Sequence, residues 1–362
     1  MSTVASVLTA IDAVAPFSKA ASWDPVGLQI GDAGVAVETA AVCHDVTEAV
    51  VGYLEGRPVD LLVSYHPLLF GPQSALTAGP TPGGRALRLA RSGVAVVAVH
   101  TAFDVARGGS ADALAVALGL SDIGRFGPVW AGDAAKFVVF VPEGAADRVA
   151  AAMAEAGAGV IGNYTQCSFR IDGTGTFLPG PGAEPTTGRP DRLNREPEVR
   201  LEMVGPASRR DAVAEAVLAS HPYEEPAFDA YEVQGNTGML GRLGTYPRPA
   251  ALGEFADRVG GALGAAVRYA GEPDRPVAAV AVAPGSGASL IEAAAGRADV
   301  FVTGDVSHHR ALTALDRGLA VVDGGHVPTE RPGLRALYAA VSEIVPDTRD
   351  LSRFDSHPWR EP

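Results

Sequence analysis

Several short runs of the chain are continuously apolar and do not alternate between apolar and polar residues. They are residues 61–63, 94–99, 277–283, 300–302 and 319–322. Strands buried on both faces, as in a parallel sheet covered by helices, have this pattern. Segments with helical character lie between them, at 84–91, 287–295 and 309–315. This alternation predicts an α/β fold with largely parallel, buried strands.

The segment between about residues 126 and 233 has a different order of elements. The expected order is strand 136–141, helix 145–155, strand 167–172, strand 199–204, helix 208–219 and strand 227–233. This order, β-α-β-β-α-β, is that of a ferredoxin-like unit. We therefore expect an α/β domain at 1–125 plus 236–362, interrupted by an inserted domain at 126–235. The Pro/Gly-rich stretch at 179–192 is interpreted as a mobile surface loop.

The two outer parts of the chain resemble each other. VDLLVSYH (59–66) aligns with ADVFVTGD (298–305), which pairs Asp60 with Asp299. SGVAVVAVHTAFD (92–104) aligns with RGLAVVDGGHVPTE (317–330) after one residue of slippage, and both end in a histidine followed four positions later by a carboxylate. A chance match in Ala/Val-rich sequence is the alternative, but the shared polar ending favours two related α/β halves.

Polar side chains follow the predicted strands of both halves directly. They are His66, His100, Asp104, Asp305, His326 and Glu330. In open α/β sheets, ligands bind beyond the carboxyl ends of the strands. Imidazole and carboxylate are common ligands of zinc, manganese and iron. We therefore predict a metal site formed by His66, Asp104, His326 and Glu330.

Other histidines and one glycine-rich turn have less specific interpretations. His44, His221 and His357 are interpreted as ordinary surface or hydrogen-bonded residues. His308 and His309 open a predicted helix, as a solvated pair or with one side chain facing the cleft. PGSGAS (284–289) is either a phosphate-binding turn or a tight turn with serine caps, since the full nucleotide-binding fingerprints are absent.

Composition restricts the class of protein. With 362 residues the chain is longer than chains that usually fold around a single hydrophobic core. A formal charge of -13 argues against non-specific nucleic-acid binding, which needs clustered basic residues. The only cysteines are Cys43 and Cys167, so no disulfide framework is implied. The N-terminus has helical apolar spacing and no signal-peptide pattern, and no apolar run is long enough for a membrane span, so we expect a cytoplasmic location.

Five ordered motifs resemble a known family. They are SWDPVGLQIGD (22–32), SYHPLLF (64–70), HTAFDVARGGSADALA (100–115), TGDVSHHRAL (303–312) and GGHVPTER (324–331). Together they are similar to the Nif-three-like dinuclear metal-centre hexameric proteins, also called GTP cyclohydrolase I type 2 homologues. CSFRIDGTGTFLPG (167–180) and HPYEEPAFDAYEV (221–233) resemble the PII/CutA-like insertion that some members carry.

The resemblance implies a toroidal homohexamer with one or two divalent cations per chain. His66, Asp104, His326 and Glu330 would be the ligands, with Glu330 bridging. Where the family has the first of two adjacent histidines, this chain has Tyr65. A phenol is a poor ligand because its reference pKa is near ~10. We therefore expect weaker occupancy at the site that includes Asp104.

Two functions are open at this stage. The first is a metal-dependent hydrolase of a nucleotide-like or phosphate-bearing small molecule, in which Tyr65 or His100 gives a proton or orients water. His309 is a further candidate for contact with the substrate. The second is a non-enzymatic, oligomeric metal-binding or regulatory scaffold.

Overall fold

The computed structural model describes residues 2–129, 134–161, 164–233 and 238–354. The chain divides into two compact units, Met1–Trp130 with Thr237–Pro362, and Ala131–Asn236. Strand β7 (Ser121–Val129) pairs with β12 (Gly238–Ala251) in a sheet of the larger unit. The smaller unit therefore begins a few residues after the point at which the sequence placed it.

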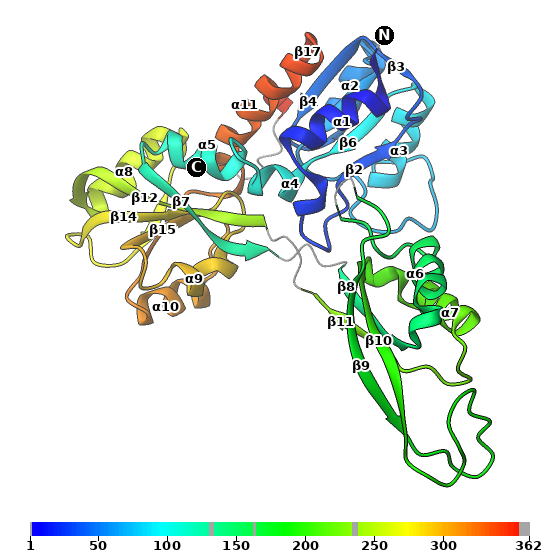
Figure 1. Ribbon diagram of the computed structural model, residues 1–362. Helices are drawn as coiled ribbons and strands as arrows, with labels where there is room; N and C mark the ends of the chain where they lie inside the picture. The colour runs from blue at the N-terminus through cyan, green and yellow to red at the C-terminus, as the bar shows by residue number, and fades with distance from the viewer. Residues whose placement is uncertain (1, 130–133, 162–163, 234–237, 355–362) are drawn as a thin grey trace. The chain divides into compact units, whose positions relative to one another are not determined.

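The first sheet of the larger unit has the strand order β17-β4-β5-β6-β2 (Figure 1). Its bounds are β2 (Gly27–Ile30), β4 (Thr39–Cys43), β5 (Leu61–Ser64), β6 (Ala95–Ala98) and β17 (Asp347–Asp350). Only β2 runs antiparallel to its neighbour. Helix α1 (Val4–Val14) packs on one face together with α11 (His326–Ile344). Helices α2 (Glu48–Gly56) and α3 (Pro82–Arg91) pack on the other face.

The second sheet has the order β13-β16-β15-β14-β12-β7. Its remaining strands are β13 (Arg268–Ala270), β14 (Pro276–Val282), β15 (Val300–Thr303) and β16 (Ala320–Asp323). Helices α5 (Ser110–Ala117) and α8 (Leu252–Leu263) pack on one face. Helices α9 (Ile291–Ala294) and α10 (His308–Asp316) pack on the other. A short antiparallel pair, β1 (Ser2–Thr3) and β3 (Ala36–Val37), completes the strands described in this unit.

The fold of the larger unit is mixed α/β. The continuous apolar runs form the parallel strands β5, β6, β14, β15 and β16, as predicted. The first sheet is largely parallel, as expected, with β2 as its antiparallel edge strand. In the second sheet antiparallel strands flank the parallel strands on both sides, so there the expectation holds only for the centre. The flanking strands were missed because they are short or rich in Gly, Pro and charged residues.

One carboxylate plays the same structural part in each sheet. Asp60 Oδ2 accepts the backbone N–H groups of Glu38 and Thr39, both at 2.9 Å. Asp299 Oδ2 accepts those of Ala278 and Ala279, at 2.9 and 2.8 Å. Asp60 comes directly before β5 and binds the backbone at the start of the neighbouring strand β4. Asp299 comes directly before β15 and binds the backbone of the neighbouring strand β14 in the same way. The two aspartates are those that the sequence comparison had aligned.

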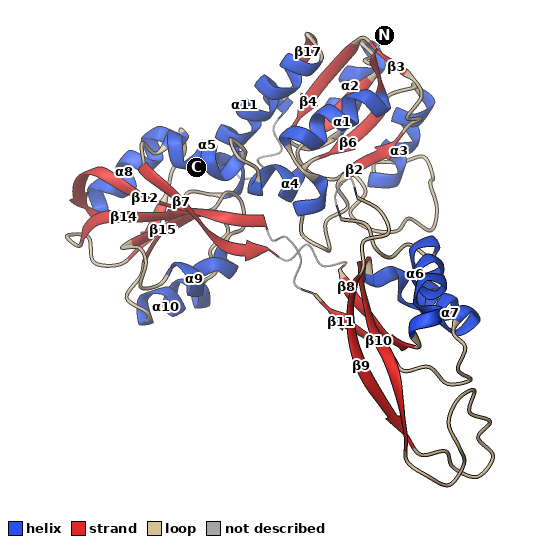
Figure 2. Ribbon diagram, viewed as in Figure 1, coloured by secondary structure: helices blue, strands red, loops and turns tan. Residues whose placement is uncertain are grey.

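The smaller unit contains one antiparallel sheet and two helices. In chain order its elements are β8 (Ala135–Val141), α6 (Ala146–Glu155), β9 (Phe169–Phe177), β10 (Asn194–Gly205), α7 (Arg210–Ser220) and β11 (Phe228–Glu232). The strand order is β11-β8-β10-β9. Both helices lie on one face of this sheet (Figure 2). Phe137, Leu201 and Met153 are among the buried residues that join the sheet to the helices.

Two helices of the larger unit begin with a histidine directly after a buried parallel strand. Helix α4 (His100–Val105) follows β6, and α11 follows β16. The same edge of both sheets therefore carries the histidines and carboxylates that the sequence singled out. No helix in the described part of the chain is long and apolar enough to cross a membrane.

Candidate metal centre

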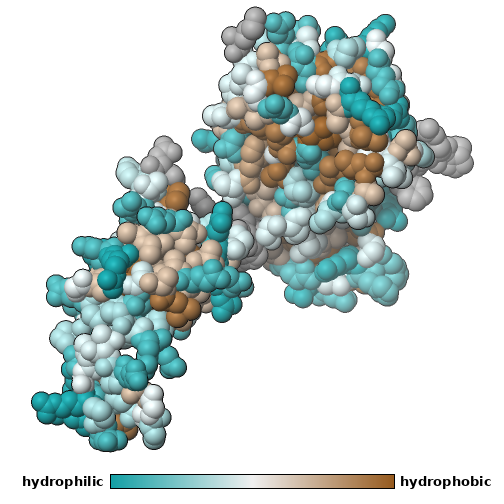
Figure 3. Space-filling model, turned by 90° about the vertical axis from the view of Figure 1, so that its right-hand side faces the viewer, coloured by the Kyte–Doolittle hydropathy of each residue, from teal (hydrophilic) through white to brown (hydrophobic). Residues whose placement is uncertain are grey.

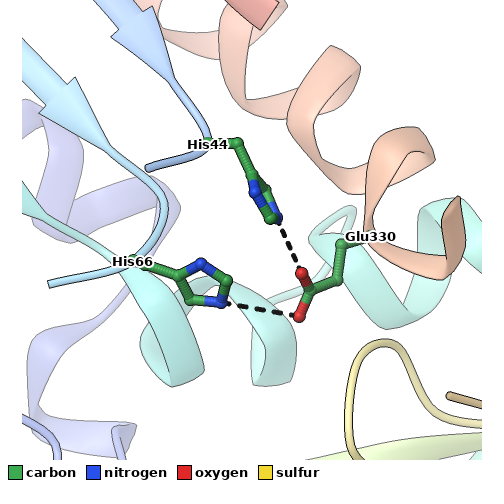
Figure 4. A group of neighbouring side chains, drawn as sticks. All are labelled: His44, His66 and Glu330. Carbon is green, nitrogen blue, oxygen red and sulfur yellow. Dashed lines mark hydrogen bonds and ion pairs between the residues drawn. The ribbon is translucent and has the colours of Figure 1, made fainter. Parts of the chain in front are cut away.

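Three side chains from three elements meet at the carboxyl ends of the parallel strands. His44 follows β4, His66 comes two residues after β5, and Glu330 lies in the second turn of α11 (Figure 4). Their ligand atoms all lie within 4.8 Å of one another. His44 and Glu330 are almost fully buried.

Glu330 is the centre of this group because its carboxylate contacts three imidazoles. Oε2 lies 2.7 Å from His44 Nε2. Oε1 lies 3.2 Å from His326 Nε2 and 3.7 Å from His66 Nε2. His326 and Glu330 stand four residues apart in α11, so successive helical turns place them on one face.

Each imidazole is held from behind by a second carboxylate. Asp45 reaches Nδ1 of His44 at 3.0 Å with Oδ2, and Nδ1 of His66 at 3.1 Å with Oδ1. Asp305 Oδ2 lies 2.7 Å from Nδ1 of His326. A carboxylate at Nδ1 keeps the proton there and leaves the Nε2 lone pair for a metal ion. The donor set and its orientation therefore fit a divalent cation.

Hydrogen bonds between the imidazoles and the carboxylates shift the pKa values of both kinds of group. Burial alone would lower the pKa of His66, but hydrogen bonds to Asp45 and Glu330 raise it to about 10. The hydrogen bond to Glu330 raises the pKa of His326 to about 9, although burial opposes it. Burial would raise the pKa of Glu330, but hydrogen bonds from the three imidazoles hold it well below its usual range. Glu330 is thus an anion surrounded by cationic or metal-binding groups.

The turn PGSGAS packs directly against Glu330. Gly285 has φ +60°, and a Cβ atom there would lie 2.3 Å from Glu330 Oε1 and 3.4 Å from His326 Nε2. Its backbone N–H donates to Thr329 Oγ1 at 3.0 Å. Only glycine allows the backbone to approach the carboxylate this closely. The turn therefore forms a wall of the site.

Tyr65 and Asp104 form a separate buried pair. The phenol of Tyr65 donates a hydrogen bond to Asp104 Oδ1, and the tyrosine is fully buried. Burial, followed by the charge of Asp104, raises the pKa of the phenol well above its usual value. Burial also raises the pKa of Asp104 to about 6, although His100 and the phenol oppose the shift. Tyr65 is thus a neutral donor to Asp104.

One cavity of about 510 Å³ contains most of the residues that the sequence had selected. His66, His100, Asp104, His326 and Glu330 line it. His309 is exposed on α10 and is not among the described residues that line this cavity. His357 lies outside the described residues.

The sequence analysis missed His44, and with it the neighbouring Asp45 that holds two of the imidazoles. His44 had been interpreted as an ordinary histidine, yet it makes the shortest contact to Glu330 of the three imidazoles. Its ring stacks on Tyr65, with centroids 5.5 Å apart and an interplanar angle of 13°. The available signal was its position directly after the apolar run 40–43, the same position relative to a strand that favoured the other histidines.

Comparison with known proteins identifies the family. The family model described as Duf34/NIF3 (NGG1p interacting factor 3) matches residues 2–357. The chain belongs to the NIF3 family. The resemblance carried by the five sequence motifs is therefore confirmed.

NIF3 relatives match this chain over most of their length. A Mycobacterium leprae protein is 40% identical over 339 residues, which cover 91% of this chain and 87% of the relative. A Bacillus subtilis protein is 38% identical over 88% of this chain and 87% of its own. Both are named GTP cyclohydrolase 1 type 2 homolog.

Solved structures of other proteins show the same fold. A Bacillus cereus protein related to NIF3 has a TM-score of 0.66 and 34% identity, and the match covers 100% of this chain and 99% of that one. A Staphylococcus aureus protein has a TM-score of 0.66 at 27% identity, with the same coverage. The mixed α/β arrangement is thus shared with these two solved structures.

Proposed function

We propose that the protein is a metal-dependent hydrolase of a nucleotide-like or phosphate-bearing small molecule. His44, His66, His326 and Glu330 would hold one or two divalent cations. The observation that carries the proposal is that three imidazoles, each held at Nδ1 by a carboxylate, direct Nε2 at one buried glutamate. The names of the relatives point to GTP ring opening as the first reaction to test.

The contacts of Glu330 support a bridging role. Its Oε2 faces His44, whereas its Oε1 faces His66 and His326. A carboxylate that directs its two oxygens to different imidazoles is suited to two neighbouring cations. Mixed nitrogen and oxygen ligands are compatible with zinc, manganese or iron. Asp104, which lines the same cavity, would serve the second cation.

A bound divalent cation supplies Lewis acidity, which polarises a substrate oxygen and makes water a better nucleophile. In hydrolysis the water oxygen bonds to the electrophilic atom and loses one proton, the bond to the leaving group breaks, and the leaving group takes one proton. His100 lines the cavity and is suited to donate that proton. The phenol of Tyr65 is less suited because it is fully buried and donates to Asp104.

The test is metal content and turnover of the purified chain and of Glu330→Gln. Mass spectrometry would count equivalents of each metal, and chromatography would follow GTP and a panel of nucleotides. We expect bound divalent metal in the parent, strong loss in Glu330→Gln, and turnover that is lost with it. Circular dichroism checks the fold, and exposed His309→Ala is the matched control. If Glu330→Gln bound metal as tightly as the parent, the proposed metal centre at Glu330 would be refuted.

The alternative is a metal-binding or regulatory scaffold without turnover. Self-association is compatible with both the hydrolase and the scaffold. We propose that the chain forms the homohexamer that the family resemblance implies. On the face drawn in Figure 3, apolar residues gather in patches on the larger unit, which supports a buried interface between copies. Light scattering would test the assembly. Metal retention without turnover on any nucleotide would favour the scaffold.

We also propose that the smaller unit is a ferredoxin-like insertion of the PII/CutA-like type. Its element order, β8-α6-β9-β10-α7-β11, supports this assignment, as does its antiparallel strand order. An experimental structure of the isolated segment would test it.

A further inference from the structure

Two exposed aromatic rings stand at the same cavity as the metal group. Trp23 is 59% exposed and Phe70 is 54% exposed. Their ring centroids lie 5.9 Å apart with an interplanar angle of 26°, so the rings are stacked. Both residues line the cavity together with His66, His326 and Glu330. Large aromatic side chains exposed together at a concave site are typical of ligand contact.

Both rings are carried by backbone that buried hydrogen bonds hold in place. Ala21 N–H donates to Thr101 Oγ1 at 2.9 Å, and Thr101 N–H donates to Asp24 Oδ2 at 2.9 Å. These bonds fix the chain on both sides of Trp23. The aromatic pair is therefore exposed and yet held, which limits the entropy lost when a ligand binds.

Gln29 does the same for Phe70. Its Oε1 accepts the N–H groups of Leu68 and Leu69 at 2.8 and 3.0 Å, and its Nε2 donates to Leu69 O at 2.9 Å. Trp23, Asp24 and Gln29 all belong to the motif SWDPVGLQIGD, to which the metal centre assigns no part. The hydrogen bonds of this motif hold the backbone segments that carry the two rings.

His100 links the aromatic pair to the metal group. It meets Trp23 and Phe70 edge to face, at centroid distances of 5.9 and 6.0 Å. It also meets His66 edge to face at 5.0 Å. His100 has φ +24°, a conformation that non-glycine residues rarely adopt, and its Nδ1 lies 3.0 Å from the fully buried Asp24. A ligand ring stacked on Trp23 or Phe70 would thus be separated from the metal group only by the His100 side chain.

We propose that Trp23 and Phe70 form a stacking platform for the planar heteroaromatic ring of the substrate. The inference deepens the proposed function, because it names the part of the ligand that the cavity recognises. The platform selects by the ring, while the sugar or phosphate portion extends into the rest of the cavity. A volume of about 510 Å³ is within the range for small-molecule sites.

The experiment compares ligands with and without a heteroaromatic base on the full-length protein. Isothermal titration calorimetry would measure the binding of GMP, AMP and UMP, with ribose 5-phosphate as the control that lacks a base. The variants are Trp23→Leu and Phe70→Leu, which keep apolar bulk, and Trp23→Phe, which keeps a ring. Tyr269→Leu removes an exposed aromatic residue outside the cavity lining and is the matched control.

We expect at least one nucleotide to bind more tightly than ribose 5-phosphate. Trp23→Leu and Phe70→Leu should weaken that binding about 10- to 100-fold. Trp23→Phe should keep most of the affinity, Tyr269→Leu should keep all of it, and ribose 5-phosphate should bind equally to every variant. The proposal is overturned if no nucleotide exceeds ribose 5-phosphate, or if Trp23→Leu binds nucleotides like the parent.

Two further measurements separate this inference from its alternatives. Metal content, measured on the same samples, distinguishes a failed platform from a failed metal centre, since the platform variants should retain metal. Light scattering identifies the case in which the two rings pack against a second copy. Loss of the oligomer in Trp23→Leu without a change in nucleotide affinity would assign the pair to that interface and overturn the platform.

Discussion

The phenol of Tyr65 donates a hydrogen bond to the carboxylate of Asp104, and both side chains are buried beside the metal group. Tyr65, at the position where the family resemblance predicts a histidine, therefore binds a carboxylate, while His44 adds an imidazole at Glu330. The candidate centre thus has three imidazoles around Glu330 without a histidine at position 65.

Tyr65→Phe should destabilise the protein. It removes the donor and leaves the buried Asp104 carboxylate short of one hydrogen bond, which costs about 1–3 kcal/mol in the free energy of unfolding. Urea unfolding followed by circular dichroism measures the effect, with exposed Tyr269→Phe as the control. An unchanged midpoint would show that the hydrogen bond between Tyr65 and Asp104 contributes nothing to the free energy of unfolding.

Tyr65→His tests the sequence expectation that the two cation sites are unequally occupied, and it should raise the metal content of the protein.

Asp45 should matter more for metal affinity than Asp305. Asp45 contacts Nδ1 of both His44 and His66, whereas Asp305 contacts only that of His326 and is half exposed. Asp45→Asn should weaken metal binding by about 10- to 100-fold, the usual effect of losing a residue that orients a ligand. Competition with a fluorescent chelator gives the affinities, and exposed Asp316→Asn is the control. Equal losses for Asp45→Asn and Asp305→Asn would contradict this division.

Gly285→Ala should expel metal, whereas Gly318→Ala should not. Both glycines have positive φ, +60° and +73°, so both variants carry a backbone strain of about 1–2 kcal/mol. Only at Gly285 does the new Cβ meet Glu330, because nothing lies within 4 Å of the corresponding position at Gly318. Metal analysis and thermal unfolding separate the two effects. Full metal retention in Gly285→Ala would mean that the carboxylate moves freely.

His221 in the smaller unit should make stability depend on pH. Its Nε2 donates to Phe140 O and its Nδ1 accepts from Tyr223 N–H, both at 3.0 Å, so the neutral ring is satisfied at both nitrogens. Burial lowers its pKa. The unfolded chain therefore binds the proton first. The free energy of unfolding is highest above a pH of about 6.5 and falls as the pH drops from there toward the folded-state pKa.

An NMR titration of His221 and denaturant unfolding between pH 5 and 8 would measure this effect. His221→Gln should flatten the pH dependence of unfolding of the smaller unit over that window. A folded-state pKa at or above that of a free histidine would rule the effect out.

How far the sequence predicts this molecule depends on where each strand lies. The apolar runs at 61–63 and 300–302 could be recognised because their strands are buried on both faces. Strand β17, with the sequence DTRD, could not, because no apolar side chain marks it. It pairs with β4, and partners 308 positions apart, Asp347 and Thr39, leave no local pattern.

The same reason explains which site residues could be predicted. His66, His326 and Glu330 were selected because the strands before them were recognised. His44 was missed because strand β4 was not among the predicted strands, so the histidine after it looked isolated. Its role depends on a contact with Glu330, and a single sequence gives no information about such distant contacts.

The contact between His44 and Glu330 joins residues 286 positions apart. A ribosome adds about 5–20 residues per second, so Glu330 is made roughly 15–60 s after His44. During that interval the nascent chain holds His44, His66 and Asp45 without their central carboxylate, and the whole smaller unit is synthesised in between. The complete cation site is therefore a property of the nearly finished polypeptide. Truncated chains that end before α11 should be unable to retain metal.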